Sequence, residues 1–280
     1  MTVLTANDDI VVVGLGATGV ACAQFLTRTG LPFAVMDTRT EPPGLAAVRG
    51  ARPEVEAILG RLDDDRLAGA DVIVLSPGLA SDLPPFERAR ASGVRVVGDV
   101  ELFAGAVRRP VIGITGSNGK STVTCMARDM AQAHGLNVKA GGNLGPSALE
   151  LLVGEEPDLY VLELSSFQLE STHSLELEAA ALLNISEDHL DQHPDMAAYV
   201  QAKSRIFTHA KRAVVPPELR HLEAVAGVSD VVTFSLVDEA ADYCLRDDGG
   251  RQWLTTPQGT ICTTDDVGAL GGHNHANALA

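Results

Sequence analysis

The residues Gly113–Thr122 read Gly-Ile-Thr-Gly-Ser-Asn-Gly-Lys-Ser-Thr and combine glycines with one lysine and two terminal hydroxyls. Glycine lets backbone N–H groups approach a ligand closely, and the start of a helix favours an anion. Lys120 adds a positive charge, and Ser121 or Thr122 can offer a hydroxyl to Mg²⁺, as in a P-loop. The stretch therefore predicts a phosphate-binding site.

The elements around this stretch support that interpretation. An apolar run from Val111 predicts a buried strand, and Val123–Ala133 predicts a helix, so strand, loop and helix follow in the required order. The spacing departs from the general motif, because five residues rather than four separate Gly113 from Gly119. Counting from Ile114 gives the four intervening residues of the motif, but the motif's first glycine is then missing. The alternative to a phosphate-binding site is an ordinary glycine-rich turn.

A second glycine motif lies near the start of the chain. Gly14–Gly19 has the form G-x-G-x-x-G between a predicted strand, Ile10–Val13, and a predicted helix, Val20–Thr29. A second strand, Phe33–Met36, ends at Asp37 about twenty residues on, which is the layout of a dinucleotide site. The motif predicts a nucleotide or diphosphate site, and its alternative is close helix–strand packing alone.

Polar residues follow two predicted strands in this half. Asp37 could accept a hydrogen bond from a ribose hydroxyl or a base N–H, and Thr38 and Arg39 stand beside it. The strand Asp71–Leu75 ends in the polar turn Ser76–Gly78. Open α/β sheets bind ligands at the carboxyl ends of their strands, so these turns are candidate ligand contacts.

Three further ionisable residues are candidates for a site near the phosphate loop. Glu163 lies inside the apolar strand Leu159–Leu164, and a buried carboxylate is expensive unless it is paired or holds a metal. We expect a Mg²⁺ ligand, with a salt bridge to a lysine as the alternative. His189 follows another predicted strand between acids, and Lys203 lies in a predicted helix, Met196–Ala210.

The 280 residues suit two α/β domains, with 45% hydrophobic residues, 4% aromatic residues and 27 glycines. We expect a Rossmann-like parallel-sheet domain over residues 1–108, in which residues 41–67 are irregular. A P-loop α/β domain with added β-hairpins follows over residues 109–280. Arg108–Pro110 is the predicted linker.

Composition also excludes some classes of function. A net charge of -16 argues against a nucleic-acid partner. The start of the chain lacks the basic region of a signal peptide, and glycines break its most apolar stretch, so we expect no membrane span. The four cysteines have no metal-ligand spacing, which favours free thiols in the cytoplasm and argues against a zinc site.

Several ordered motifs together resemble one family. They are the loop Gly113–Thr122, Gly142-Asn143, Glu163–Gln168, Asn184 with Glu187–His189, Lys203, His273-Asn274 with Asn277, and the first-half motifs at Gly14–Gly19, Met36–Arg39 and Leu75–Gly78. This set is similar to the Mur ligases of peptidoglycan synthesis, and within them to the member that adds D-glutamate. The similarity extends over the whole chain.

The resemblance implies an ATP-dependent ligase that uses Mg²⁺. ATP would phosphorylate the terminal carboxylate of UDP-N-acetylmuramoyl-L-alanine, and the amine of D-glutamate would attack the acyl phosphate to form the amide. The first glycine motif would then hold UDP, and a dinucleotide such as NAD is no longer the expected ligand. A cytoplasmic monomer is expected.

The resemblance also assigns roles to residues. Lys120, His189 and Lys203 would be catalytic, with Lys203 carbamylated so that it can bind a metal. The metal ligands would be Ser121, Glu163, His189 and Lys203. The ATP contacts would be Gly116, Ser117, Asn118, Gly119, Lys120, Ser121, Thr122, Asn274 and Asn277. The contacts to the UDP substrate would be Ala17, Thr18, Asp37, Thr38, Arg39, Ser76, Pro77, Gly78, Asn143, Ser165, Gln168 and His189.

One departure from the family pattern affects the expected activity. The family has a third, C-terminal domain that binds the incoming amino acid, and this chain ends within about two turns of a predicted helix start near His273. We expect a truncated protein that binds ligands but does not ligate. The alternatives are a non-catalytic UDP-sugar or nucleotide-binding module, a P-loop kinase or ATPase, and another Mur or folylpolyglutamate-type ligase.

Overall fold

A computed structural model describes residues 4–187, 193–268 and 271–280 of the chain. Contacts divide the chain into two compact units. Unit 1 consists of Met1–Arg108 together with two later segments, Pro146–Gly154 and Ser171–Leu175. Unit 2 contains the remaining residues from Arg109 onward. Both units are α/β, as expected from the sequence.

Unit 1 contains a five-stranded sheet in the order β3-β2-β1-β4-β5, and neighbouring strands in it pair in parallel. Its three central strands are buried along their whole length, as their β-branched and apolar residues predict. The strands are β1 Ile10–Val13, β2 Ala34–Asp37, β3 Ala57–Leu59, β4 Val72–Leu75 and β5 Arg95–Val97.

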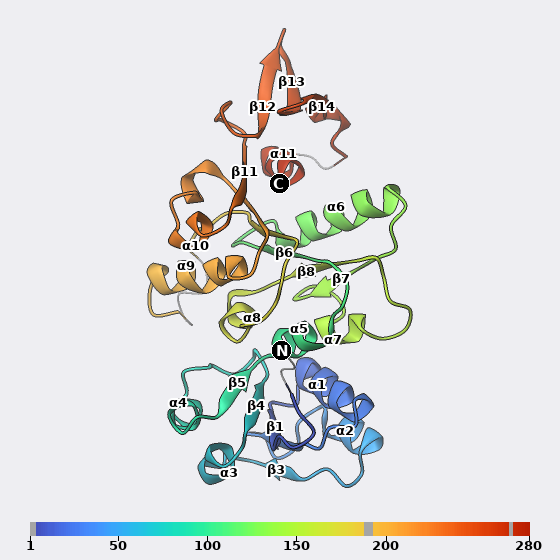
Figure 1. Ribbon diagram of the computed structural model, residues 1–280, viewed down its shortest axis with the longest axis vertical. Coiled ribbons are helices and arrows are strands. Elements are labelled where there is room, and N and C mark those ends of the chain that lie inside the picture. Colours follow the sequence, from blue (N-terminus) through green and yellow to red (C-terminus); the bar gives the residue numbers. More distant parts are fainter. Residues whose placement is uncertain (1–3, 188–192, 269–270) are drawn as a thin grey trace. The chain divides into compact units, whose positions relative to one another are not determined.

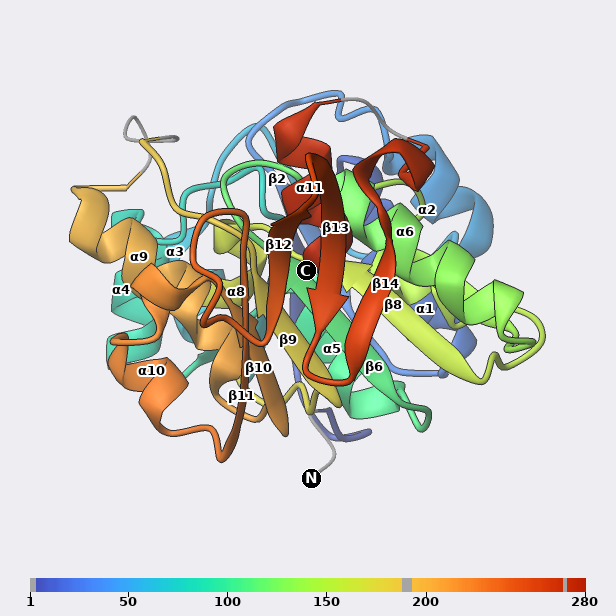
Figure 2. The same ribbon diagram turned by 90° about the horizontal axis from the view of Figure 1, so that it is seen from above.

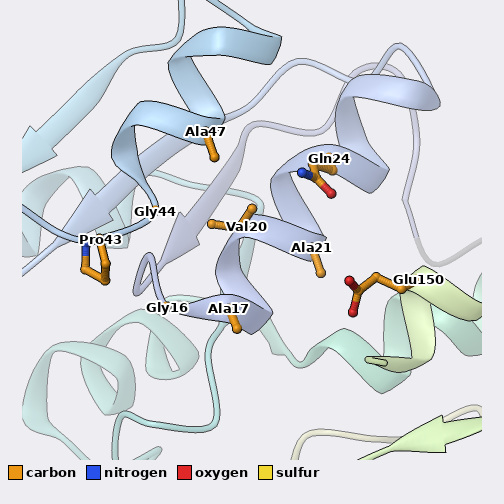
Figure 3. A pocket seen from close by; sticks show the side chains of 9 residues that line it. All are labelled: Gly16, Ala17, Val20, Ala21, Gln24, Pro43, Gly44, Ala47 and Glu150. Carbon is orange, nitrogen blue, oxygen red and sulfur yellow. The ribbon is translucent and has the colours of Figure 1, made fainter. Parts of the chain in front are cut away.

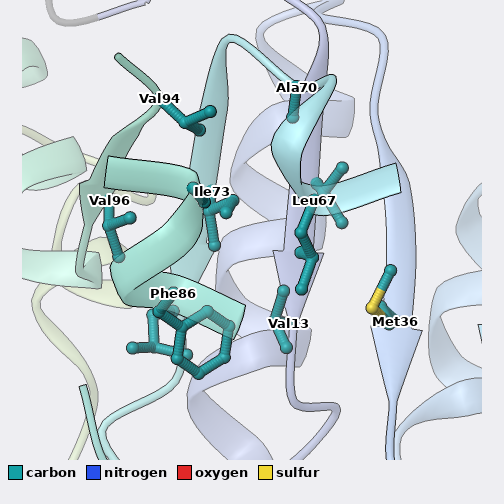
Figure 4. Close-up of a cluster of buried hydrophobic side chains, with 11 residues drawn as sticks. Val13, Met36, Leu67, Ala70, Ile73, Phe86, Val94 and Val96 are labelled. Atoms are coloured by element: carbon teal, nitrogen blue, oxygen red, sulfur yellow. The ribbon is translucent and has the colours of Figure 1, made fainter. Parts of the chain in front are cut away.

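Helices alternate with these strands (Figure 1). They are α1 Ala17–Arg28, α2 Leu45–Ala51, α3 Asp64–Ala68, α4 Pro84–Ala91, α5 Asp99–Ala106 and, from the later part of the chain, α7 Ala148–Leu151. Figure 4 shows one core cluster, in which Phe86 of α4 and Leu67 of α3 pack against Val13 and Ile73 of the sheet.

The expectation that residues 41–67 are irregular is wrong. That stretch holds α2, β3 and the start of α3. The first two are short, and α2 contains Gly50 and buries only Val48, so neither carries a strong apolar period. Pairing of β3 with β2 stabilises β3 in a way that local sequence does not reveal.

Unit 2 contains a nine-stranded sheet in the order β14-β13-β12-β11-β10-β9-β6-β8-β7. The pairings from β7 to β12 are parallel, and β12, β13 and β14 form antiparallel hairpins, so the predicted added hairpins are confirmed. The strands are β6 Val111–Thr115, β7 Val138–Gly142, β8 Leu159–Glu163, β9 Ala179–Leu182, β10 Arg212–Val215, β11 Asp230–Ser235, β12 Tyr243–Asp248, β13 Arg251–Thr256 and β14 Gly259–Thr263.

The helices of unit 2 are α6 Lys120–Ala133, α8 Ser166–Glu170, α9 Met196–Ser204, α10 Glu223–Ala226 and α11 Gly272–Leu279. Figures 1 and 2 both place α9 and α10 on the opposite side of this unit from α6. A single helix over residues 196–210 was expected, but α9 ends at Ser204 and a 3-10 turn, Arg205–Phe207, follows. Within the described residues, no helix has the length and apolar character needed to cross a bilayer.

Candidate functional site

The predicted phosphate loop lies in unit 2 between β6 and α6. Gly113 is not part of the loop, because it lies within β6, and a Cβ there would come 2.8 Å from a methyl carbon of Leu177. The turn itself runs from Gly116 to Gly119, and Gly119 has a left-handed φ of +83°. The glycine that the spacing argument counted first therefore serves strand packing, and α6 begins directly at Lys120.

Two lysines meet the same loop carbonyl. The Nζ atom of Lys120 donates to the carbonyls of Gly116 and Ser117, at 2.9 Å each. The Nζ atom of Lys203, a side chain only 2% exposed, donates to the Gly116 carbonyl at 3.0 Å. Two ammonium groups thus lie next to the loop, and their charge favours an anion there.

Glu163 is at the centre of a small polar cluster. Its carboxylate is 2% exposed and accepts hydrogen bonds from Ser121 Oγ at 2.7 Å and from Asn143 Nδ2 at 2.6 Å. Both donors are neutral, and no lysine pairs with this carboxylate within the described residues, so the alternative of a salt bridge to a lysine is wrong there. A buried carboxylate beside a hydroxyl at the loop suits a hard divalent cation that keeps other oxygen ligands. No group of three or more His, Cys, Asp or Glu side chains in the described ranges forms a metal site by itself.

The C-terminal helix α11 reaches the phosphate loop. A Cβ on Gly119 would lie 2.5 Å from Asn277 Oδ1, so the two residues are in close contact. Asn277 is 9% exposed, and its Nδ2 donates to Asn274 Oδ1 at 3.2 Å. The structure thus brings Asn277 next to the loop and joins Asn274 to it by a hydrogen bond.

The predicted substrate contacts at the end of β8 form a local turn. Ser165 Oγ accepts from the Gln168 amide at 3.2 Å, and the Gln168 side-chain carbonyl accepts from the Ser165 amide at 3.2 Å. This reciprocal pair begins α8, one residue beyond Leu164 and two beyond Glu163. The predicted residue His189 lies outside the described residues.

Two residues beside the loop were not assigned a site role from sequence. Asn184 clamps the loop residue Asn118, whose amide donates to Asn184 Oδ1 and whose carbonyl accepts from Asn184 Nδ2, at 2.9 Å each. Tyr199 is fully buried, with its hydroxyl 3.2 Å from Ser117 Oγ and its ring 4.6 Å from Lys203 Nζ. Asn184 follows a predicted strand, and this position could have marked it as a site residue. The position of Tyr199 within a predicted helix gave no such indication.

In unit 1 the candidate residues follow three neighbouring strands. Ala17 and Thr18 begin α1 after β1, Asp37–Arg39 follow β2, and Ser76–Gly78 follow β4. The carboxyl ends of parallel strands share one edge, and β1 lies where the strand order reverses, which is the usual ligand position in such sheets.

Asp37 is fully occupied by protein donors. Its carboxylate, 2% exposed, accepts from the Leu15 amide at 2.7 Å, the Arg39 amide at 2.9 Å, and the Arg39 guanidinium at 2.8 and 2.7 Å. The guanidinium bonds, and then the two amides, outweigh burial and lower the pKa of Asp37 from 3.8 to about 2. A ligand hydroxyl would have to share or replace the contact with Arg39, which is half-exposed.

The glycines of the first motif are not all explained in the same way, because one is tightly packed and another faces open space. A Cβ on Gly19 would come 1.8 Å from the Gly14 carbonyl oxygen, which explains that glycine by helix–strand packing. A Cβ on Gly16 would meet no atom of the described residues within 4 Å. A pocket with a volume of about 370 Å³ begins there. Figure 3 shows Ala17, Val20 and Ala47 among the residues that line it.

Comparison with known families matches both halves of the chain. Residues 8–98 match the family "Mur ligase MurD-like, N-terminal domain", and residues 114–280 match "Mur ligase middle domain". UDP-N-acetylmuramoylalanine--D-glutamate ligase of Nitrosococcus oceani is 47% identical over 272 residues, covering 96% of this chain and 60% of that protein. The enzyme of the same name from Vibrio parahaemolyticus is 48% identical over 274 residues, covering 97% of this chain and 61% of that protein. The chain therefore spans about 60% of the length of these relatives.

Solved structures share the fold at lower identity. A UDP-N-acetylmuramate:L-alanyl-gamma-D-glutamyl-meso-diaminopimelate ligase from Neisseria meningitides gives a TM-score of 0.61 at 18% identity, covering 97% of this chain and 91% of that one. UDP-N-acetylmuramate-alanine ligase of Thermotoga maritima gives a TM-score of 0.53 at 20% identity, and the match covers 98% of this chain and 63% of that one. With a phosphate loop of this geometry and a family match over more than half of its length, the chain belongs to the Mur ligase family.

Proposed function

We propose that the chain supplies the UDP-substrate and ATP sites of a UDP-N-acetylmuramoyl-L-alanine:D-glutamate ligase. Residues 1–108 would bind the UDP part of the precursor, and residues 109–280 would bind ATP and contact the muramoyl-alanine part. The observation that carries the proposal is the meeting of Ser121, Asn143 and Glu163 beside the phosphate loop. The identities of 47% and 48% to two enzymes of that name support the choice of family member.

The proposed reaction begins with phosphoryl transfer, in which positioning and charge neutralisation provide most of the catalysis. The amides of Gly116–Gly119 and the ammonium of Lys120 would hold the ATP phosphates, with Ser117, Asn118 and Thr122 on the same loop. Asn274 and Asn277 would contact the adenine. The γ-phosphoryl group passes to the terminal alanine carboxylate, and ADP leaves. The D-glutamate amine then attacks the acyl phosphate, and phosphate leaves as the amide forms.

The residues present fit a magnesium ion. Ser121 and Glu163 would hold it, and bound there it would neutralise charge on the phosphate oxygens. His189 and Lys203 would belong to a second metal site. Lys203 would have to be carbamylated for this, because an ammonium repels a cation whereas a carbamate binds one. Asn143, Ser165 and Gln168, and also His189, would contact the muramoyl-alanine part of the substrate.

The proposed UDP site lies at the carboxyl edge of the sheet in unit 1. The orphan N–H groups at the start of α1, around Ala17 and Thr18, would face the diphosphate. Asp37, Thr38 and Arg39 would contact the nucleoside from the end of β2, and Ser76, Pro77 and Gly78 would close the other side.

Calorimetric titration of the chain with UDP-N-acetylmuramoyl-L-alanine tests this proposal, with UDP-N-acetylglucosamine as the control. Selective binding of the precursor is the expected result. Equal affinity for both ligands would contradict the choice of substrate, because the muramoyl-alanine contacts would then contribute nothing. A folded chain that binds neither ligand would contradict the proposed UDP site.

A further inference from the structure

His193 is a buried residue that the proposed mechanism does not use. Its side chain is 2% exposed, in unit 2 between α8 and α9. Nε2 lies 2.9 Å from Ser166 Oγ, and Nδ1 lies 3.5 Å from Glu170 Oε1. The imidazole also stacks on Phe167, with ring centroids 5.1 Å apart and planes at 4°. Three of the five residues of α8 therefore contact this one ring.

The other side of the ring meets the phosphate loop through one further residue. The ring of Tyr199 lies 5.1 Å from the imidazole, tilted by 54°. Tyr199 in turn contacts Ser117 of the loop through its hydroxyl and Lys203 through its ring. The imidazole thus contacts α8 on one side and, on the other, Tyr199, which itself contacts the loop residue Ser117 and Lys203.

The position of α8 matters because of what precedes and begins it. Glu163 lies three residues before Ser166, and the Ser165–Gln168 pair forms the first turn. A shift of α8 would move Gln168, which is proposed to contact the acceptor substrate. A shift of Tyr199 would move Ser117 and Lys203, on the phosphate side. Buried polar groups with directional partners on two elements can fix the relative placement of those elements.

We propose that His193 is a positioning residue that links the acceptor-substrate contacts on α8 to the phosphate loop, so that occupation of one favours binding at the other. This inference rests on the proposed function. The polar contacts of Nε2 and Nδ1 fix α8, and the ring faces of the same imidazole fix Phe167 and Tyr199. Phenylalanine preserves the ring but removes both nitrogens. Glutamine preserves one polar group without the ring.

The test measures thermodynamic coupling between two ligands. The affinity of a non-hydrolysable ATP analogue with Mg²⁺ is measured by calorimetry with and without saturating UDP-N-acetylmuramoyl-L-alanine. In the unmodified chain we expect the second ligand to raise the affinity about fivefold or more. In His193→Phe we expect less than about twofold, with each separate affinity within about threefold of the unmodified chain. His193→Gln should recover part of the coupling.

Two further variants keep the result interpretable. Ser166→Ala removes the Nε2 partner with a small change in volume and should also weaken the coupling, so it carries the test if His193→Phe does not fold. His134→Phe, an exposed histidine at the end of α6, is the matched control and should leave the coupling unchanged.

The outcomes separate this inference from the proposed function. A folded His193→Phe, or Ser166→Ala in its place, with full coupling would overturn the positioning role, and so would an unmodified chain that binds both ligands without coupling. Failure of the unmodified chain to bind the UDP precursor would instead overturn the proposed function on which the inference depends.

Discussion

Replacing Asp37 by asparagine should destabilise unit 1 in a pH-dependent way. The carboxylate holds Leu15 and Arg39 together at the edge of the sheet, and its pKa is lowered from 3.8 to about 2. That lowering of the Asp37 pKa corresponds to roughly 2 kcal/mol at neutral pH. Because the Arg39 side chain is 51% exposed and solvent screens its charge, we expect about 1–2 kcal/mol.

The sign of the pH dependence follows from the lowered pKa. The folded state holds the proton less tightly than the unfolded state, so the stabilisation is fully present above about pH 5 and is lost as the pH falls through 3.8 toward 2. About half of it should remain at pH 3. Asp37→Asn carries no titrating group there, so its deficit relative to the unmodified chain should shrink as the pH falls.

Hydrogen exchange read by mass spectrometry, on peptides that cover β1 and β2, gives the local opening free energy without assuming that both units unfold together. Peptides from β12–β14 in unit 2 serve as the internal control. A deficit in β1 and β2 that is equal at pH 7 and pH 3 would refute the ionic explanation. A deficit below about 0.3 kcal/mol at pH 7 would refute any stabilising role of the cluster.

Three further substitutions test other contacts. Gly119→Ala combines a φ of +83° with a Cβ 2.5 Å from Asn277 Oδ1, so we expect a loss of about 1–3 kcal/mol in unfolding free energy and weaker binding of an ATP analogue in calorimetry. Gly19→Ala puts a Cβ 1.8 Å from the Gly14 carbonyl, and should cost about 3 kcal/mol, seen as faster exchange in β1 but not in unit 2. Glu163→Gln keeps the shape but not the charge, and should reduce Mg²⁺ affinity about 10–100-fold while analogue binding without Mg²⁺ stays unchanged; unchanged Mg²⁺ affinity would exclude Glu163 as a ligand.

The sequence was most informative where one local pattern determined both structure and chemistry. The phosphate loop and the first glycine motif each required a strand, a turn and a helix in fixed order, and β6 with α6 and β1 with α1 have that order. The sequence also placed a carboxylate inside β8, because Glu163 interrupts an apolar run. Its partners Ser121 and Asn143 come from 42 and 20 residues away, and no local pattern specified which of them would pair with it.

The features that were missed depend on long-range packing. β3 is held by β2, and α2 has too few apolar residues to show a helical period. The place of Gly113 stayed open, because spacing alone cannot distinguish a strand glycine from a loop glycine. His193 gave no signal at all, since its partners belong to α8 and to Tyr199, and only the tertiary structure brings them to one ring.

The division of the chain into units has a consequence for synthesis. The chain passes between unit 1 and unit 2 five times, because Pro146–Gly154 and Ser171–Leu175 return to unit 1. Ala148 and Leu149 of the first returning segment are fully buried, and Glu101 accepts hydrogen bonds from the amides of His173 and Ser174 in the second, at 2.6 and 3.0 Å. On a ribosome, the N-terminal unit therefore remains incomplete until residue 175 has emerged, well after its own sheet. A gene fragment cut at residue 108 encodes the sheet of unit 1 but not all of its core.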